Sequence, residues 1–392
     1  MRPGGKRHEV SNEFGDEPRA PVEGPGEPEG EADVDAQSAG APRVLFTRAR
    51  VLGTLVFVAS ALAFLYFVLP KLLGLHQTWD RIKHGNLWWF GLAAVLEVCS
   101  FGGYVWLFRG VFVRDESRIE WRESYQITMA GLAATRLFAA AGAGGIALTA
   151  WALRRSGMPP RTVAGRLIAF NVILYAVYMT TLVIDGVGLY LGVIPGGGSF
   201  AITIGPAIFG AVVIVLFLGV STIPADLERI AGRWTSGQRR AQRLVFRLAA
   251  ASATLAGGVR TAIDLIRTRN PSLLGALAWW GFDIAVLWAC FHAFGASPPK
   301  GVIVMSYFVG MLANTLPLPG GIGGVDGGMI GAFVAFGVDA ELAVVAVLAY
   351  RAFAFWLPTL PGIVAYLQLR RTVQRWGAER PAVLRGASDP VS

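Results

Sequence analysis

The chain has 392 residues, of which 54% are hydrophobic and only 16% are charged, and its mean hydropathy is +0.51. A soluble globular domain has more charge and fewer apolar residues, so this composition excludes that class and indicates a polytopic membrane protein. The formal net charge is +9, and most basic residues lie between apolar segments. This distribution is typical of cytoplasmic loops and does not indicate a surface for nucleic acid.

The first 42 residues differ from the rest of the chain. They contain ten acidic residues, four Lys or Arg, and a single aromatic residue, Phe14. Such a segment cannot bury enough apolar surface to offset the entropy of ordering, so we predict a disordered, acidic, Pro/Gly-rich cytoplasmic tail over 1–42. A first membrane span is predicted at 51–69, which has no charged residue.

Seven further apolar segments follow, which makes about eight in total and predicts an all-α membrane fold. They cover residues 87–108, 124–153, 167–194, 201–223, 272–294, 301–338 and 342–369. Arginine-rich stretches lie before the first segment, between the third and the fourth, and after the last. The positive-inside rule places these stretches, and with them both termini, in the cytoplasm.

With this orientation, segments 124–153 and 301–338 each begin and end on one side of the membrane. Each is therefore predicted to be a re-entrant hairpin or a pair of broken half-helices. Gly and Pro at 139–145 and 317–324 mark the turns. We assign structural breaks to four prolines: Pro317, Pro319, Pro358 and Pro361.

The two broken segments align with each other at an offset of 180 residues, with identities such as Thr135 with Thr315. The apolar segments that flank them run in opposite directions. This pattern indicates an inverted repeat, with repeat one at about 87–194 and repeat two at about 272–369. In transporters of that architecture, broken helices meet near the bilayer midplane and form the substrate site.

A basic stretch, 224–271, separates the two repeats and carries apolar residues at near-helical spacing. Two interpretations stay open: an amphipathic helix that lies on the inner leaflet and attracts anionic lipid, or a cytoplasmic linker that is basic only because of the topology. We expect the transmembrane domain to cover 43–371 and a second cytoplasmic tail to cover 372–392.

Ionisable side chains inside apolar segments cost about 2.5 to 3.5 kcal/mol each to insert, so each one needs a reason. They are Glu97, Arg136, Asp185, Asp283, Asp326 and Arg351. Glu97 and Asp283 are expected to serve in structural pairing or polar packing, and Asp185, near the external end of its segment, to be solvated. Asp326 and Arg351 allow two interpretations: a buried structural ion pair, or a site in which the always-charged Arg351 binds phosphate.

Sequence motifs for catalysis are missing. The chain contains no HExxH, GxSxG or GxxxxGK[ST] motif, and Cys99 and Cys290 have neither metal-ligand nor redox spacing. We therefore predict that the protein is not an enzyme, has no cofactor and no metal, and that any driving force is external or absent.

The C-terminal block NTLPLPGGIGGVDGG, followed by GVDAELAVVAVLAYRAFAFWLPTLPGIVAYLQLRR, resembles the lysylphosphatidylglycerol synthase transmembrane family, also called the flippase-like or YbhN-like family. The resemblance covers roughly 51–371. Family members commonly have Glu where this chain has Asp326, and the first-repeat stretch FAAAGAGGIALTAWALRRSG has neither the Pro nor the acid usual there. The resemblance implies a lipid-translocating module of a bacterial plasma membrane, without the soluble aminoacyl-transfer domain of the two-part synthases.

The function implied by the resemblance is translocation of a phospholipid or a lipid-linked substrate whose headgroup crosses between the repeats. Expected ligands are anionic or aminoacylated phospholipids or polyprenyl-phosphate-linked lipids, with an envelope-lipid enzyme as a further partner. The expected substrate-binding residues are Arg351, Asp326, Asn314, Gly320, Gly321, Gly323, Tyr350 and Arg136. Two alternatives stay open: a non-transporting partner or scaffold of an envelope-lipid enzyme, and a membrane-embedded lipid-modifying enzyme.

Overall fold

The structure is a computed structural model, and it describes residues 85–113, 119–137, 143–223, 240–313 and 323–386. The predicted acidic tail and the predicted first span, 51–69, lie outside the described residues. Within the described residues every regular element is a helix and no strand occurs, so the all-α class is confirmed.

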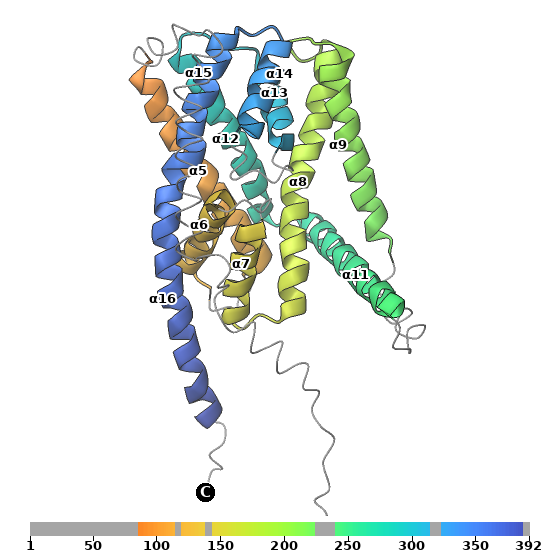
Figure 1. The fold of residues 1–392 in the computed structure, drawn as a ribbon, viewed down its shortest axis with the longest axis vertical. Coiled ribbons are helices and arrows are strands. Elements are labelled where there is room, and N and C mark those ends of the chain that lie inside the picture. Colours follow the sequence, from red (N-terminus) through yellow and green to blue (C-terminus); the bar gives the residue numbers. More distant parts are fainter. Residues whose placement is uncertain (1–84, 114–118, 138–142, 224–239, 314–322, 387–392) are drawn as a thin grey trace, which may run out of the picture. The chain divides into compact units, whose positions relative to one another are not determined.

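The described helices follow one another as Figure 1 shows. They are α5 (Leu87–Phe112), α6 (Trp121–Leu137), α7 (Ala143–Arg155), α8 (Pro160–Tyr190), α9 (Phe200–Ser221), α11 (Arg240–Arg267), α12 (Leu274–Ala293), α13 (Lys300–Leu312), α14 (Gly324–Ala335), α15 (Ala340–Arg351) and α16 (Leu357–Gly386). A 3-10 turn, Pro271–Leu273, precedes α12, and a π-helical segment, Ala352–Trp356, joins α15 to α16.

Five stretches of the described chain are long and apolar enough to cross a membrane. They are α5, α8, α9, α12 with its preceding turn, and the continuous helix Ala340–Trp376. All five coincide with predicted apolar segments, because a run of about 20 apolar residues matches the hydrocarbon thickness whatever the tertiary structure. The chain is therefore a multi-pass membrane protein.

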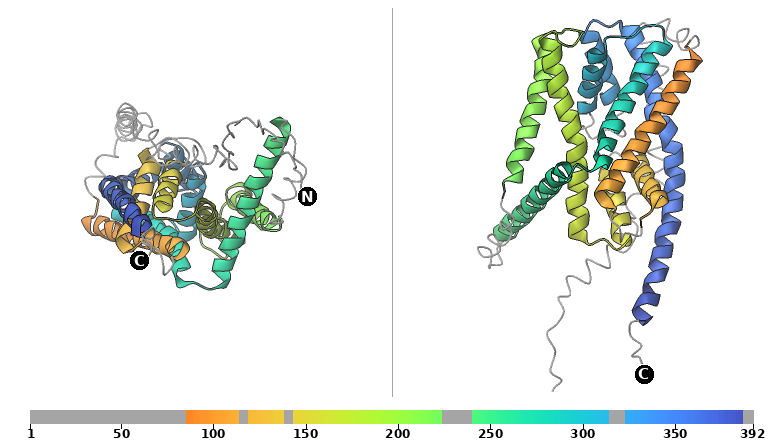
Figure 2. Two further views of the ribbon diagram at one scale, coloured as in Figure 1. Left: turned by 90° about the horizontal axis from the view of Figure 1, so that it is seen from below. Right: turned by 180° about the vertical axis from the view of Figure 1, so that it is seen from behind.

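The two segments predicted to be broken each contain two short helices. We call α6 and α7 the first helix pair, and α13 and α14 the second helix pair; the two helices of each pair pack together. Close approach depends on glycine in both, since a Cβ at Gly145 would lie 2.5 Å from the Gly131 carbonyl oxygen, and one at Gly310 would lie 3.0 Å from the Val325 carbonyl oxygen. Figures 1 and 2 show the first pair toward the end where α8 begins and the second toward the end where α8 finishes.

Long helices enclose the two pairs. α5 packs along α12, where a Cβ added at Gly275 would lie 2.3 Å from the carbonyl oxygen of Gly103. α16 packs along α6, where a Cβ at Gly362 would lie 2.8 Å from the carbonyl oxygen of Met129. These contacts between backbones bring α5, α6, α12 and α16 together around the polar side chains described below.

The predicted breaks at Pro358 and Pro361 are wrong. Both residues lie within the continuous helix Ala340–Trp376. The missing N–H of Pro358 is accommodated by the π-helical segment Ala352–Trp356, which directly precedes α16, and not by a break in the chain. Pro317 and Pro319 lie outside the described residues, so their role stays a prediction.

α16 continues through the boundary expected at 371 and ends at Gly386, so the first part of the expected tail is helical, and its cytoplasmic location stays a prediction. One further expectation needs correction. Asp185 is not solvated: it is 6% exposed, because Gly186 and Gly301 allow α9 and α13 to approach α8 closely around it. The helix α11 lies in the basic stretch between the repeats and packs against α8 and α9.

Candidate functional site

Ionisable side chains from helices far apart in the sequence gather inside the bundle. Glu97, Asp283, Asp326 and Arg351 are all at most 8% exposed. Arg136 is close enough to Glu97, Asp283 and Arg351 for direct electrostatic interaction. We call these five residues the charged cluster. Because burying an isolated charge is costly, the partners of each member determine what the cluster can do.

Asp326 lies in the first turn of α14, and its two carboxylate oxygens have different partners. Oδ2 accepts a hydrogen bond from the backbone N–H of Gly323 at 2.8 Å, and the φ of +82° at Gly323 favours glycine at this position. Oδ1 lies 2.6 Å from Nε of Arg351, the last residue of α15. The predicted pair therefore exists as a buried ion pair between the second helix pair and α15.

Arg136, in the last turn of α6, contacts the π-helical segment. Its Nη2 donates to the carbonyl oxygen of Ala354 at 2.7 Å, and its Nη1 to that of Phe355 at 3.4 Å. Pro358 stands four residues after Ala354 and has no N–H, so the Ala354 carbonyl lacks its usual intrahelical donor. The Thr359 hydroxyl donates to the Phe355 carbonyl at 2.5 Å. The first helix pair thus supplies the Ala354 carbonyl with the hydrogen bond that Pro358 cannot donate, and it adds a second bond to the Phe355 carbonyl.

One aromatic ring lies near both arginines of the cluster. The guanidinium carbons of Arg351 and Arg136 lie 5.0 Å and 5.7 Å from the centroid of the Phe355 ring. Arg136 also lies 5.6 Å from the ring centroid of Phe101 on α5. The negative ring faces stabilise cations where water is scarce. Two like charges can therefore stay near each other at this depth.

Asp283 on α12 accepts hydrogen bonds from two tyrosines. The hydroxyls of Tyr307 on α13 and Tyr350 on α15 both donate to its Oδ2, Tyr350 at 2.9 Å. Tyr350 was expected to bind substrate, but its hydroxyl is bonded to Asp283 and it is 1% exposed. Since Tyr350 directly precedes Arg351, the end of α15 holds both aspartates of the charged cluster.

Glu97 on α5 is only 2% exposed, and its Oε2 accepts no hydrogen bond from any described residue. The side chain lines a cavity of about 430 Å³ between α5, α6 and α16. The rest of the described lining is apolar or aromatic and includes Phe101, Pro358 and Pro361. This Glu97 cavity gives an apolar wall next to the charged cluster, with one carboxylate oxygen free for a donor.

The structure brings five of the eight predicted substrate-binding residues to the charged cluster or its direct neighbours: Arg351, Asp326, Gly323, Tyr350 and Arg136. Asn314, Gly320 and Gly321 lie outside the described residues, so their roles stay predictions. Sequence reasoning missed Tyr307, Phe355 and Thr359. An aromatic or hydroxyl residue in an apolar span is common, so only the tertiary contacts distinguish these three.

Two comparisons with known proteins show what the chain is similar to. Residues 50–362 match the family model described as "Lysylphosphatidylglycerol synthase TM region". Three curated relatives, each described as a UPF0104 membrane protein of Methanothermobacter thermautotrophicus, are similar to parts of the chain. The first is 35% identical over 109 residues, which are 28% of this chain and 31% of the relative. The others are 29% and 27% identical over 40% and 48% of this chain, which spans 51% and 57% of their lengths.

Proposed function

Because this chain belongs to the family of lysylphosphatidylglycerol synthase TM regions, we propose that it is a translocase, which moves a phospholipid or lipid-linked substrate between the leaflets of a plasma membrane. The chain acts in this proposal as a transport protein and not as an enzyme, with both termini in the cytoplasm. The relatives' names state only that they are membrane proteins, so the activity proposed here rests on the site.

One observation carries the proposal: the buried charged cluster adjoins the apolar Glu97 cavity. A lipid headgroup is polar and its tails are apolar, so its passage requires polar and apolar walls side by side. Glu97 belongs to both the cluster and the wall of the cavity. In this mechanism the headgroup contacts the cluster while the tails stay against the apolar side or in the bilayer.

We also propose that the frame is an inverted repeat. α6, α7 and α8 begin at Trp121, Ala143 and Pro160; α13, α14 and α15 begin at Lys300, Gly324 and Ala340. The offsets are 300 − 121 = 179, 324 − 143 = 181 and 340 − 160 = 180 residues. Helix starts that recur at a nearly constant spacing support two related halves. In such transporters the substrate site lies where the halves meet, which here is the charged cluster.

Arg351 is the residue that we assign to a phosphate group. A guanidinium binds phosphate through two parallel hydrogen bonds, and the Nε of Arg351 already contacts the carboxylate of Asp326. Phosphate would compete with Asp326 for Arg351, and Arg136 lies near enough to share the negative charge. The ion pair then serves as the resting state of the site, which reconciles the two interpretations of this pair.

The test is lipid movement between leaflets in proteoliposomes that contain the full chain. We would compare headgroup-labelled anionic, aminoacylated and polyprenyl-phosphate lipids. Arg351→Lys keeps a charge opposite Asp326 but removes the forked donor geometry, and we expect it to slow movement at least tenfold. Arg370→Ala, at an exposed position of α16, is the matched control and should transport normally.

Two outcomes would contradict the proposal. No movement of any of these lipids by folded protein would favour a non-transporting partner or scaffold of an envelope-lipid enzyme. A chemically altered lipid recovered from the vesicles would favour a membrane-embedded enzyme. Equal transport by Arg351→Lys and the unchanged protein would remove Arg351 from the site but leave the translocase intact.

A further inference from the structure

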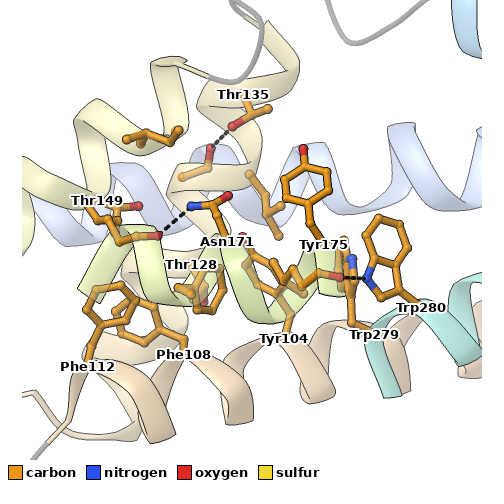
Figure 3. Close-up of a pocket in the computed structure, with 17 residues that line it drawn as sticks. Tyr104, Phe108, Phe112, Thr128, Thr135, Thr149, Asn171, Tyr175, Trp279 and Trp280 are labelled. Atoms are coloured by element: carbon orange, nitrogen blue, oxygen red, sulfur yellow. Dashed lines mark hydrogen bonds between the residues drawn. The ribbon is translucent and has the colours of Figure 1, made fainter. Parts of the chain in front are cut away.

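A second cavity, of about 230 Å³, lies between α5, α6, α7, α8 and α12 (Figure 3). Its described lining has no residue in common with that of the Glu97 cavity. Aromatic rings form much of its wall, among them Tyr104, Phe170, Trp279 and Trp280. The polar side chains in the described lining are threonines, tyrosines, tryptophans and one asparagine, none of them charged. We call this space the aromatic cavity.

The aromatic cavity corresponds by sequence offset to the ion pair of the second helix pair. The residues 180 positions before Asp326 and Arg351 are Ile146 and Asn171, and both line the aromatic cavity. Where repeat two has an acid and a base bonded to each other, repeat one has an apolar residue and an amide. At these two positions the aromatic cavity therefore has no ion pair.

Asn171 presents unused hydrogen-bonding groups to this space. Its Nδ2 donates to the Leu167 carbonyl at 2.8 Å, a bond that orients the amide (Figure 3). An amide has two N–H groups and a carbonyl oxygen, so one N–H and the oxygen stay available to a ligand. The hydroxyl of Thr135 donates to the Gly131 carbonyl at 3.0 Å and keeps its acceptor lone pairs. Thr149 makes no hydrogen bond with a described residue, so its hydroxyl can donate.

The aromatic walls are fixed in place by contacts with one another. The ring centroids of Tyr104 and Trp279 lie 4.5 Å apart, and those of Tyr104 and Phe170 lie 5.2 Å apart. Trp280 donates its Nε1–H to the Leu174 carbonyl at 2.9 Å, which orients the indole (Figure 3). Ring faces carry negative electrostatic potential and attract the weakly positive C–H groups of a sugar ring.

The aromatic walls and the uncharged polar groups of the cavity together favour one chemical class of ligand. Neutral donors and acceptors that stand side by side match hydroxyl groups, each of which donates and accepts. A phosphate or ammonium group would enter without a counter-charge in the described lining, at high desolvation cost. An acyl chain would leave the Asn171 amide unsatisfied, at a cost of about 1–3 kcal/mol. Pockets for drug-sized ligands measure about 300–1,000 Å³, so 230 Å³ suits one small ring.

We propose that the aromatic cavity binds the uncharged sugar ring of a glycolipid headgroup. The inference rests on the proposed translocase function and names a class of substrate for it. The position fits a headgroup with both sugar and phosphate, because Thr135 lines the cavity and the next residue, Arg136, belongs to the charged cluster. Trp279 of the cavity wall also contacts Phe101 of the Glu97 cavity, with ring centroids 5.4 Å apart.

The test measures lipid binding to the full chain by native mass spectrometry. The probes are monoglucosyl diacylglycerol, phosphatidylglycerol and diacylglycerol with identical acyl chains, and free glucose. We expect the glycolipid to bind at least tenfold more tightly than diacylglycerol. Asn171→Leu should weaken glycolipid binding about tenfold, the factor equivalent to one lost hydrogen bond of about 1.4 kcal/mol. Thr149→Val should have a smaller effect in the same direction.

Thr181→Val is the matched control for these variants. Thr181 lies on α8, as Asn171 does, its hydroxyl donates to the Val177 carbonyl at 2.8 Å, and it does not line the aromatic cavity. Glycolipid binding should be unchanged in this control. Thermal unfolding of each variant in detergent would identify any that fail to fold, and Thr149→Val then stands in for Asn171→Leu.

Several results would overturn the assignment. Diacylglycerol or phosphatidylglycerol binding as tightly as the glycolipid would mean that acyl chains or phosphate, not the sugar, are recognised. Free glucose binding without glycolipid binding would indicate a soluble sugar. The proposed function fails separately: glycolipid binding at Asn171 with no lipid movement in vesicles would refute the translocase, and phospholipid movement without glycolipid binding would refute only the sugar site.

Discussion

The first and second helix pairs use one backbone arrangement with two kinds of chemistry. In each pair the short helices meet at glycines, Gly131 with Gly145 and Gly310 with Gly328. The second pair presents a buried acid that is bonded to an arginine on α15. The first pair has no acid there and adjoins an uncharged cavity, while its own arginine, Arg136, binds backbone carbonyls near α16.

This difference shows that backbone and chemistry are constrained separately. Most positions that match at an offset of 180, such as Ala133 with Ala313 and Gly157 with Gly337, hold small residues, which permit close packing. The positions of the buried acid and base do not match, since Asp326 and Arg351 correspond to Ile146 and Asn171. A repeated frame can therefore hold two different polar sites, one neutralised by an ion pair and one uncharged.

The largest change in the free energy of unfolding is expected from breaking the ion pair between Asp326, in the second helix pair, and Arg351. Arg351→Ala leaves Asp326 buried and unpaired, and we expect a loss of about 3–5 kcal/mol in the free energy of unfolding. Unfolding in SDS, followed by circular dichroism, measures this loss. The double variant Asp326→Asn with Arg351→Gln should recover most of it. If Arg351→Ala unfolds like Asn171→Ala, its counterpart in repeat one, the ion pair does not hold the second pair in place.

A smaller loss in the free energy of unfolding is expected when the hydrogen bonds from Arg136, in the first helix pair, to the π-helical segment are removed. Arg136→Met removes a donor of the Ala354 carbonyl and one of the two donors of the Phe355 carbonyl, and we expect a loss of about 1.5–3 kcal/mol in the same unfolding assay. Adding Pro358→Ala should recover part of the loss, because alanine restores an N–H for the Ala354 carbonyl. Additive effects of the two changes would contradict the link between Arg136 and Pro358.

The helix contact within the first pair can be tested by adding one methyl group. A Cβ at Gly145 would lie 2.1 Å from Thr135 Oγ1 and 2.5 Å from the Gly131 carbonyl oxygen, so Gly145→Ala should destabilise the protein by about 2 kcal/mol. Gly327→Ala in the second pair meets no atom within 4 Å and is the control. That variant should be neutral or more stable, since alanine is the better helix former.

The smallest change in the free energy of unfolding is expected when a tyrosine hydroxyl that donates to Asp283 is removed. Tyr350→Phe removes one hydroxyl donor, but Tyr307 continues to donate to the same carboxylate, so we expect about 1 kcal/mol. Tyr307→Phe should cost a similar amount, and the double variant should cost more than the sum, because Asp283 then loses both hydroxyl donors. Unfolding in SDS measures all three. Strict additivity would show that water replaces the hydroxyls.

Much of the fold could be predicted because its causes are local in sequence. An apolar run such as α9 crosses a membrane by its length and composition alone. Segments 124–153 and 301–338 were predicted to be broken because loop charges and glycine or proline content can be read directly, and each proves to contain two short helices. The prolines of the last helix misled the prediction, because hydrogen bonds from another helix stabilise the irregular backbone.

The candidate site was predicted only in part. Asp326 and Arg351 stand out because a charge inside an apolar segment is costly, so it needs a partner. Tyr307 and Phe355 could not be selected, because aromatic residues are ordinary components of membrane helices. Asn171 was overlooked for a similar reason, since an uncharged amide in a span carries a weaker signal than an ionised group.

The amino-acid sequence by itself determined the membrane class, the position of most spans, the two breaks and the set of buried charges, because hydrophobicity and helix breaking act over a few neighbouring residues. Tertiary structure alone decided which groups meet. Arg136 binds the carbonyl of Ala354, 218 positions away, and Asn171 lines a cavity with Trp279 and Trp280 from another helix. Such contacts depend on how helices pack, and neither the charge nor the spacing of a residue specifies its partner across the bundle.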